Sequence, residues 1–204
     1  MALREALGRD ARDLAAARDT VRSHFGKRFD APTGWLFDVV DARPAAYPLG
    51  GDGEHDDPVL RPNQLLAYSL PHAPLNGGDG RAIEAVGAAL LTPLGLRTLG
   101  PGEFGYHGRH RGDRAERAAA YHQGTVWPWL IGPYVSAARS AGLPIDGLLA
   151  GLEGHLGEAG LGSVSETADG DPPHHPAGAP FSARSVAELI RARSLAREVG
   201  SQRT

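Results

Sequence analysis

The chain has 204 residues, a length that suits one domain with a core of its own, and we expect residues 1–204 to form a single domain. A hydrophobic fraction of 41% and a net charge of −3 indicate a globular protein and favour neither nucleic acid nor an anionic membrane as a partner. The absence of cysteine excludes disulfides, thiolate catalysis and cysteine-type zinc sites. We expect a cytoplasmic protein, because no signal-peptide core is visible and the longest apolar run, near residues 126–138, is too short to span a bilayer.

Apolar side chains recur at helical spacing over the first 25 residues and predict one long helix. Steps of 4, 7, 7 and 4 residues place five of them on one face: Leu3, Leu7, Leu14, Val21 and Phe25. Gly26 is the expected end of this helix. Residues 34–40 predict a short strand or extended segment. Residues 41–60 predict a loop, because they are rich in glycine, aspartate and proline.

Further helices follow, so we predict an all-α fold of six helices with almost no strand. We expect these helices at residues 62–71, 80–91, 125–141, 145–157 and 182–199. Asp79 is the expected cap of the helix that begins at residue 80. Thr125 is the expected cap of the helix that contains Pro128 in its first turn. The connections at residues 92–124 and 158–180 are long and irregular, as segments that line a site often are.

Residues 121–134, YHQGTVWPWLIGPY, combine polar side chains, a glycine turn and two tryptophans at the expected start of a helix. Indole rings cover the apolar faces of a sugar while amide and imidazole groups bind its hydroxyls. We therefore interpret His122, Gln123 and Trp127 as pocket residues. The alternative for this run is ordinary core, because its apolar residues also fall at helical spacing, and we assign Trp129 to the core.

Two further polar clusters stand where loops meet helices. Residues 56–64 contribute two carboxylates, a guanidinium and two amides, and residues 165–175 form a carboxylate-rich turn that includes Glu166. Glycoside hydrolysis uses one carboxylic acid to protonate the leaving oxygen and a second carboxylate to activate water or to attack directly. The alternatives are solvated loop acids in the first cluster, a surface guanidinium at Arg61 and an ordinary turn at Asp169.

A histidine pair lies within the second of these clusters. His174 and His175 stand close in sequence to Asp169 and Asp171, and a divalent metal is an alternative ligand for this group. Their spacing matches no known pattern of metal ligands. We therefore expect neither a metal nor another cofactor.

These segments strongly resemble the C-terminal glucosidase domain of glycogen debranching enzymes, the amylo-α-1,6-glucosidase family. The similar runs keep the order of the family: GWLFDVVD from residue 34, DDPVLRPNQLLAYSLPH from residue 56, LLTPLGLRTLGP from residue 90, YHQGTVWPWLIGPY from residue 121, and SETADGDPPHHPAG from residue 165, followed by SVAELIR. They cover most of the chain from residue 34 onward. The combination of RPNQ with YHQGTVWPW is highly specific.

The resemblance implies a partial (α/α)6 toroid of the six-hairpin glycosidase type, about half of the full barrel, with long loops that line the site. It also implies inverting hydrolysis of the α-1,6-linked glucose stub that remains after a glycogen branch is trimmed. Glu166 matches the general base of the family, and Asp169 is placed to orient it. The residues implied to read sugar hydroxyls or to shape the pocket are Asp57, Arg61, Asn63, Gln64, His122, Gln123 and Trp127.

The chain departs from the family pattern in two places. The general acid of the family lies upstream of everything present here, so no residue of this chain matches it. Before the last helix the family carries a run of the type Cys-x-Ala-Gln-Ala-Trp-Ser. Residues 179–185 read APFSARS instead, which removes an amide and an indole from one wall of the pocket.

We therefore expect the C-terminal half of a debranching glucosidase, active when an upstream segment or a companion chain completes the site. Half of a toroid leaves a long apolar edge in water, so self-association is another way to cover that edge. The expected ligand is an α-glucan, glycogen or its limit dextrin; neither nucleic acid nor a membrane is expected. The alternatives are a non-catalytic remnant that binds α-glucan or a partner protein, and an unrelated (α/α) enzyme acting on short α-glucosides.

Overall fold

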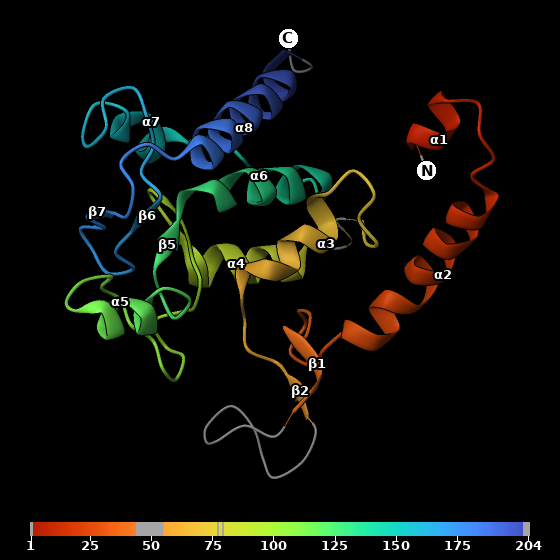
Figure 1. Ribbon diagram of the computed structural model, residues 1–204, viewed down its shortest axis with the longest axis horizontal. Helices are drawn as coiled ribbons and strands as arrows, with labels where there is room; N and C mark the ends of the chain where they lie inside the picture. Colours follow the sequence, from red (N-terminus) through yellow and green to blue (C-terminus); the bar gives the residue numbers. More distant parts are fainter. Residues whose placement is uncertain (1, 44–54, 77, 79, 202–204) are drawn as a thin grey trace.

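Helix α6 (Ile131–Ser140) lies at the centre of the protein (Figure 1). The computed structural model describes residues 2–43, 55–76, 78 and 80–201. Three helices pack against α6, and they are α3 (Leu66–Ser69), α4 (Arg81–Leu90) and α8 (Ala183–Ser201). The 3-10 helix η1 (Pro62–Leu65) leads into α3 and also contacts α6.

The hydrophobic core forms where these helices meet. The buried side chains that α4 and α6 contribute to it are Ile83, Val86, Leu90, Ile131, Tyr134, Val135, Ala137 and Ala138. Gly132 lets α8 approach α6 closely, because a Cβ atom at this position would overlap the carboxylate of Glu188. A larger residue at this position would require the Glu188 side chain to move.

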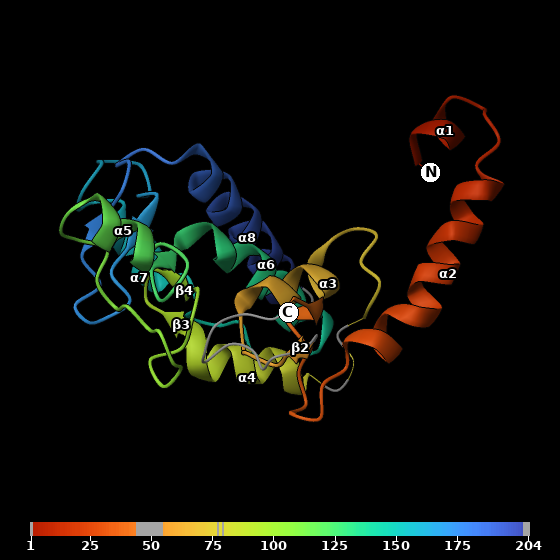
Figure 2. The ribbon, with the colours of Figure 1, turned by 60° about the horizontal axis from the view of Figure 1, so that its bottom comes forward.

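A five-stranded sheet of very short strands flanks the helices (Figure 2). Its strands are β3 (Leu91–Thr92), β4 (Gly95–Arg97), β5 (Val126–Trp127), β6 (Thr167–Ala168) and β7 (Pro176–Ala177). They lie in chain order, and each pairs antiparallel with the next. The sheet therefore brings together segments that are about forty or more residues apart in the sequence.

The register of the central strand places two polar segments side by side. Val126 of β5 pairs with Arg97 of β4 on one side and with Ala168 of β6 on the other. Gly95 makes the approach of β4 possible, since it adopts a φ of +133° and a Cβ atom there would meet the backbone of Pro128. Because β5 and β6 run antiparallel, the turn before β5 consequently lies beside the residues that follow β6, of which Asp169 is the first.

Two short helices stand beside this sheet (Figure 1). Helix α5 (Arg114–Ala120) begins with a capping box, in which the Asp113 carboxylate accepts from Ala115 N and Glu116 N and the Glu116 carboxylate accepts from Asp113 N. Helix α7 (Ala150–His155) precedes the loop to β6. Both helices lie in segments that position the candidate site.

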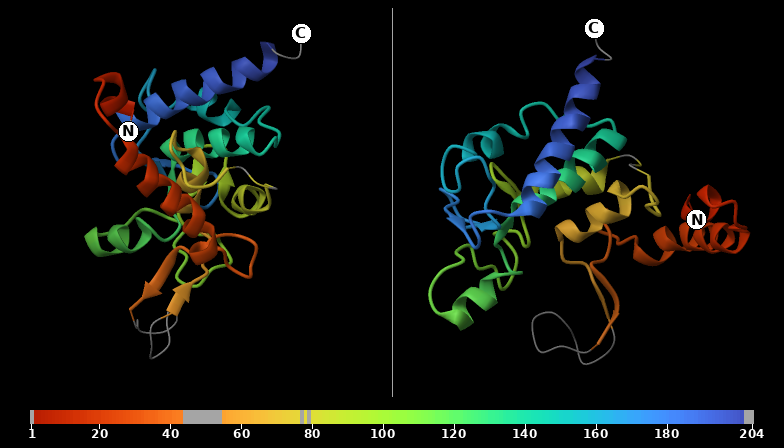
Figure 3. Two further views of the ribbon diagram at one scale, coloured as in Figure 1. Left: turned by 90° about the vertical axis from the view of Figure 1, so that its right-hand side faces the viewer. Right: turned by 45° about the horizontal axis from the view of Figure 1, so that its top comes forward.

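The amino-terminal helices stand apart from the rest of the molecule (Figure 3). They are α1 (Ala2–Ala6) and α2 (Arg12–Phe29), and no residue of either is buried. Leu3 is 74% exposed and Leu7 is 59% exposed, so their apolar side chains contact water. The apolar face of this arm is thus exposed over α1, whereas Phe25 near the end of α2 is half-buried.

A two-stranded ribbon connects the arm to the body. Strand β1 (Val39–Ala42) pairs antiparallel with β2 (His55–Asp57). Arg28 of α2 donates to the Asp56 carboxylate over 2.8 Å, and this contact lowers the pKa of Asp56 to about 2. Asp56 is therefore engaged with the arm.

Most predicted helices are confirmed. Helix α4 matches the prediction at residues 80–91, η1 and α3 match residues 62–71, and α8 matches residues 182–199. Helix α7 is shorter than the predicted 145–157. The expected cap Asp79 lies outside the described residues.

The helix expected at residues 125–141 begins later than predicted. Strand β5 and the 3-10 helix η2 (Pro128–Leu130) precede α6, so the prediction of Pro128 in a first helical turn is confirmed. The prediction of Thr125 as a cap is wrong, because its hydroxyl donates backward to the carbonyl of Ala120 over 2.8 Å. Thr125 therefore ends the turn after α5.

Two other predictions need correction. The first helix is broken into α1 and α2 near Gly8, which has a φ of +65°, and α2 continues through Gly26 to Phe29. The term all-α is imprecise, because the connections at residues 92–124 and 158–180 contribute strands to the sheet, and the first also contains α5. Strands of two or three residues are too short to show alternating hydrophobicity. The half-toroid arrangement stays a prediction.

In the part of the chain that the structure describes, every helix is too short or too polar to cross a membrane.

The core around α6 predicts a contrast between two isoleucines. Ile131 is fully buried, whereas Ile190 on α8 is 63% exposed. Ile131→Ala should lower the free energy of unfolding by about 2–5 kcal/mol, because it removes buried methyl groups and leaves a cavity. Ile190→Ala should change it by less than about 0.5 kcal/mol. Urea unfolding followed by circular dichroism measures both, and equal changes would contradict the packing described here.

Candidate functional site

The guanidinium of Arg61 joins the two polar segments that were predicted to share one site. Its Nη1 donates to the carbonyls of Thr98, over 3.0 Å, and His122, over 2.7 Å. Its Nη2 donates to Oε1 of Gln123 over 3.0 Å. Its Nε lies 3.5 Å from Oδ2 of Asp38. Arg61 therefore positions the turn before β5 through several directed contacts at once.

A hollow of about 290 Å³ lies beside Arg61. The residues that line it are Asp38, Asp57, Arg61, Pro62, Asn63, Thr98 and His122. Asn63 is exposed, and its Nδ2 donates to Oδ1 of Asp38 over 2.9 Å. Oδ1 of Asp57 accepts from the Val59 N–H over 2.9 Å. Carboxylates, an amide, an imidazole and a guanidinium thus face one small space.

Asp38 is a site residue that the sequence prediction missed. Burial raises the pKa of its carboxyl above the ordinary value, against the opposing effects of the Asn63 hydrogen bond and the Arg61 charge. The residue belongs to the segment that was predicted only as a short strand or extended run. The signal that pointed to it was the carboxylate in GWLFDVVD, within the resemblance to the family.

Gln64 takes a different place from its neighbours in RPNQ. It is 8% exposed, its Nε2 donates to the carbonyl of Arg61 over 3.1 Å, and its Oε1 accepts from the Leu36 N–H over 3.3 Å. Both ends of the amide thus bond to backbone. Gln64 supports the loop that carries Arg61, and it does not line the hollow.

Three aromatic rings form one wall of the site. The ring centroid of Tyr121 lies 4.8 Å from that of His122 and 4.7 Å from that of Trp127, edge to face in both cases. The His122 and Trp127 rings are nearly parallel, with centroids 6.2 Å apart. Nε1 of Trp127 donates to the carbonyl of Tyr121 over 3.1 Å. His122 is exposed and Trp127 is 7% exposed, so the imidazole is the more accessible of the two.

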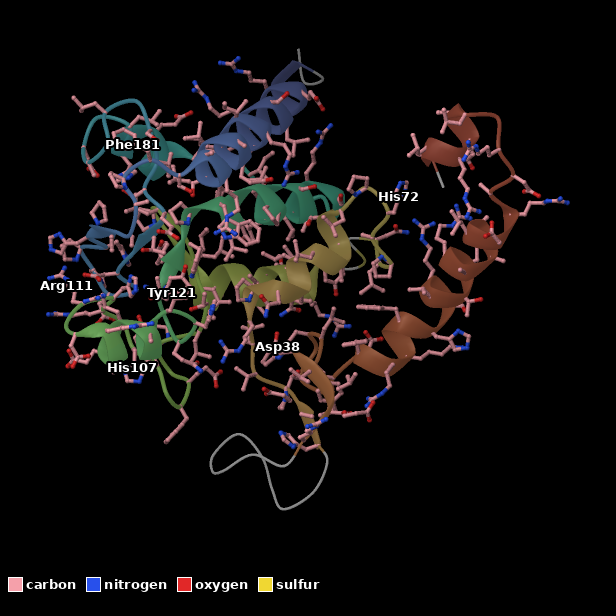
Figure 4. All side chains as sticks on the ribbon, viewed as in Figure 1. Asp38, His72, His107, Arg111, Tyr121 and Phe181 are labelled. Carbon is pink, nitrogen blue, oxygen red and sulfur yellow. The ribbon has the colours of Figure 1, made fainter. Side chains whose placement is uncertain are left out.

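Glu166 lies directly behind this aromatic wall. Its Oε1 accepts from the Tyr121 hydroxyl over 3.4 Å, and its Oε2 accepts from the Ala179 N–H over 3.0 Å. Burial raises the pKa of the Tyr121 phenol, and the nearby Glu166 charge adds to this effect. The carboxylate is half-buried, with one oxygen fixed by backbone and the other held by a long contact. Figure 4 shows Tyr121 beside β5. His107 and Arg111 lie on one side of it, near α5, and Asp38 lies on the other side.

Asp169 is buried and is held by the loop before α5. Its Oδ1 accepts from the His110 N–H over 3.0 Å, and its Oδ2 forms an ion pair with Arg111. Its N–H donates to the carbonyl of His175 over 2.9 Å. The His110 ring interacts electrostatically with both Asp169 and Glu166, so it lies near the two carboxylates. Asp169 therefore anchors the segment after β6.

The residue before Glu166 is fixed by a buried histidine. His155 is 1% exposed, and its Nε2 lies 3.2 Å from the Ser165 hydroxyl and accepts from the Ser165 N–H over 3.3 Å. Its Nδ1 lies 2.9 Å from Oε2 of Glu158. The Ser165 hydroxyl is buried and has no access to a substrate. This group holds the approach to β6 in place.

The structure brings the predicted site residues into two adjoining groups. Asp57, Arg61, Asn63 and His122 surround the hollow, and Gln123 reaches it through Arg61. Glu166 and Asp169 lie behind Tyr121, near His110. Three participants were not among the predicted site residues, namely Asp38, His110 and Tyr121. For Tyr121, its adjacency to His122 in the sequence was the signal. Among the described residues, no group of three or more histidine, aspartate or glutamate side chains is arranged to hold a metal ion.

The contacts of Arg61 predict that lysine cannot replace it. A single ammonium group lacks the planar fork that reaches Thr98, His122 and Gln123 together. Arg61→Lys should lower the free energy of unfolding by about 1–3 kcal/mol, because the partly buried acceptors on Thr98 and Gln123 lose a partner. The matched control is Arg109→Lys, at an exposed position, which should change it little. Chemical denaturation compares the two; equal stability of both variants would contradict the bridging role.

The surroundings of His110 predict a depressed pKa. Burial lowers the pKa of this imidazole below the ordinary 6.5, and the Arg117 charge lowers it further. Because the pKa of His110 is lower in the folded protein than in the unfolded chain, the neutral imidazole contributes to the stability of the fold above pH 6.5. This contribution is lost as the pH falls through the pKa of the folded state. An NMR titration of the His110 ring should therefore give a midpoint below 6.5, and Arg117→Gln should raise it. A midpoint that falls in this variant would contradict the arrangement.

Comparison with known proteins agrees with the resemblance found in the sequence. A family model described as amylo-alpha-1,6-glucosidase matches residues 2–191. The glycogen debranching enzyme of Saccharomyces cerevisiae is 35% identical over 92 residues, which are 41% of this chain and 6% of that enzyme. The chain thus spans a small part of the length of this relative. Because the family model covers nearly the whole sequence, from the arm to α8, the chain belongs to the amylo-alpha-1,6-glucosidase family.

Proposed function

We propose that this chain supplies the water-activating side of an inverting glycoside hydrolase that removes α-1,6-linked glucose stubs from an α-glucan. Membership of the family supports a glycoside hydrolase type of function. The observation that carries the finer proposal is the position of Glu166, one tyrosine ring away from His122 and Trp127. Glycoside hydrolysis uses one carboxylate to activate the attacking water, and Glu166 stands close to the side chains proposed to bind the sugar.

Glu166 acts in this proposal as the general base. The Ala179 N–H holds Oε2, and Oε1, which has a long 3.4 Å contact from the Tyr121 hydroxyl, accepts a proton from a water molecule. The water oxygen attacks the anomeric carbon as the bond from this carbon to the leaving oxygen breaks on the opposite face of the sugar. The water proton passes to Glu166, and the leaving oxygen takes a proton from an acid. We assign that acid to a segment outside this chain, since no residue here matches the one in the family.

The hollow beside Arg61 binds the sugar in this proposal. Asp57, Asn63 and His122 face it and offer acceptors and donors for hydroxyl groups. Arg61 and Gln123 hold the turn in place while Trp127 backs the His122 ring. Asp169 acts indirectly, because it fixes the strand end that follows Glu166.

We further propose that a companion segment or a second copy completes the fold. Helices α1 and α2 contain no buried residue, and leaving a large aliphatic side chain in water forgoes about 1.5–3 kcal/mol each. The limited share of the yeast relative that the chain covers supports the same proposal. The completed assembly is a toroid in which the arm packs against its missing neighbours.

A substrate that needs no proton donor tests this division of labour. α-D-Glucosyl fluoride expels fluoride without protonation, so the isolated chain should hydrolyse it while releasing no glucose from limit dextrin. NMR should find β-glucose as the first product, because a single displacement inverts the anomeric carbon. Glu166→Gln should lower the rate by about 10²–10⁴-fold, the usual effect of losing a general base.

The control for this experiment is Glu103→Gln, in the turn after β4, which should keep the rate of the unaltered chain. Folded protein that leaves the fluoride intact, or a rate unchanged in Glu166→Gln, would contradict the catalytic proposal. The alternative is a non-catalytic remnant, which the absence of a matching acid favours. Retardation in a gel containing glycogen, with no turnover of the fluoride, would support that alternative.

A further inference from the structure

A cation lies over the aromatic wall of the site. The guanidinium carbon of Arg184, in the first turn of α8, is 5.1 Å from the ring centroid of Trp127 and 4.8 Å from that of Trp129. Planar guanidinium groups are attracted to indole faces and stack on them. The two tryptophans therefore hold Arg184 at a defined place without the help of a carboxylate.

Arg184 lines a hollow that has no acidic side chain among its lining residues. This hollow of about 150 Å³ is lined by Pro62, Asn63, Thr98, His122, Trp127, Trp129, Leu130 and Arg184. Across the described ranges, Arg184 forms no hydrogen bond or ion pair, and its residue is exposed. Its N–H donors thus remain available to a ligand in the hollow.

This arrangement differs from a surface built for a neutral sugar. A glucose ring stacks its C–H face on an indole, but the guanidinium of Arg184 covers the faces of Trp127 and Trp129. What the hollow offers instead is a fork of N–H donors, with the Asn63 amide and the His122 imidazole nearby. Such a fork matches two oxygens of a carboxylate or phosphate group.

We infer that the hollow under Arg184 binds a sugar unit that carries an oxyanion, as a phosphate monoester or a carboxylate. This inference rests on the proposed sugar-binding function and specifies the class of glucan. The adjoining hollow beside Arg61 disfavours an anionic group, because Asp38 and Asp57 line it and repel an anion placed there. An anionic substituent is therefore directed to Arg184, and the hydroxyl groups of the same unit face Asn63 and His122.

Binding of small probes tests the inference without any turnover. Glucose 6-phosphate should bind about tenfold more tightly than glucose at low salt, and added salt should reduce the difference. The indole N–H signals of Trp127 and Trp129 should shift in the NMR spectrum, and that of Trp35, which bonds to the Pro58 carbonyl elsewhere, should not. Glucuronate in place of the phosphate ester tells whether a carboxylate suffices.

Variants of α8 provide the decisive comparison. Arg184→Gln should abolish the preference for glucose 6-phosphate over glucose, whereas Arg197→Gln, which removes the same charge from an exposed position on α8, should keep it. Arg184→Lys retains the charge without the fork and should reduce the preference several-fold, which tests the inference even if the glutamine variant does not fold. Inorganic phosphate should compete with glucose 6-phosphate in the unaltered chain.

Two results would overturn the inference. One is that glucose binds as tightly as both glucose 6-phosphate and glucuronate, and the other is that the preference survives in Arg184→Gln. Neither result concerns Glu166, so hydrolysis of glucosyl fluoride remains a separate measurement. Retained anion preference without hydrolysis would instead contradict the catalytic proposal alone.

Discussion

The pairing of Val126 with Arg97 on one side and Ala168 on the other is the constraint on which the site depends. Without it, the turn before β5 and the segment that carries Glu166 have no reason to meet, since they are about forty residues apart. Strands this short cannot hold together through their own ladder bonds. They persist because β5 leads through η2 into α6, which buries Ile131 and its neighbours in the core. The helical core therefore positions a site that lies on loops.

Arg61 holds the loops of the site together, as strand pairing holds the segments of the sheet together. Backbone carbonyls from two segments and one side-chain amide converge on its guanidinium, and Asp38 balances its charge. The side chains most exposed to the hollow and the side chain that holds the loops are consequently different. His122 and Asn63 are exposed to the hollow, whereas Arg61, with 14% of its side chain exposed, is committed mainly to protein contacts.

From the sequence, the helices and the residue types of the candidate site were predicted better than the contacts that hold the site together. The helices with regular apolar spacing were placed well, and α4 is an example. The sheet was missed because two-residue strands carry no period, and the split of the first helix at Gly8 was missed because the apolar spacing runs across it. The roles of Asp38 and Arg184 depend on contacts between distant segments, which local patterns do not encode. Gln64 was assigned to the pocket by motif, yet its surroundings are backbone.

Asp38 shows why the proton donor is assigned to a partner segment. Its raised pKa has the direction that a general acid needs. A donor must also present its proton to the leaving oxygen, and both carboxyl oxygens of Asp38 are already engaged. Oδ1 accepts from Asn63, and Oδ2 faces the Arg61 guanidinium, so a proton on either oxygen would oppose an existing donor or cation. Asp38 is thus suited to hold Arg61 and Asn63 in place.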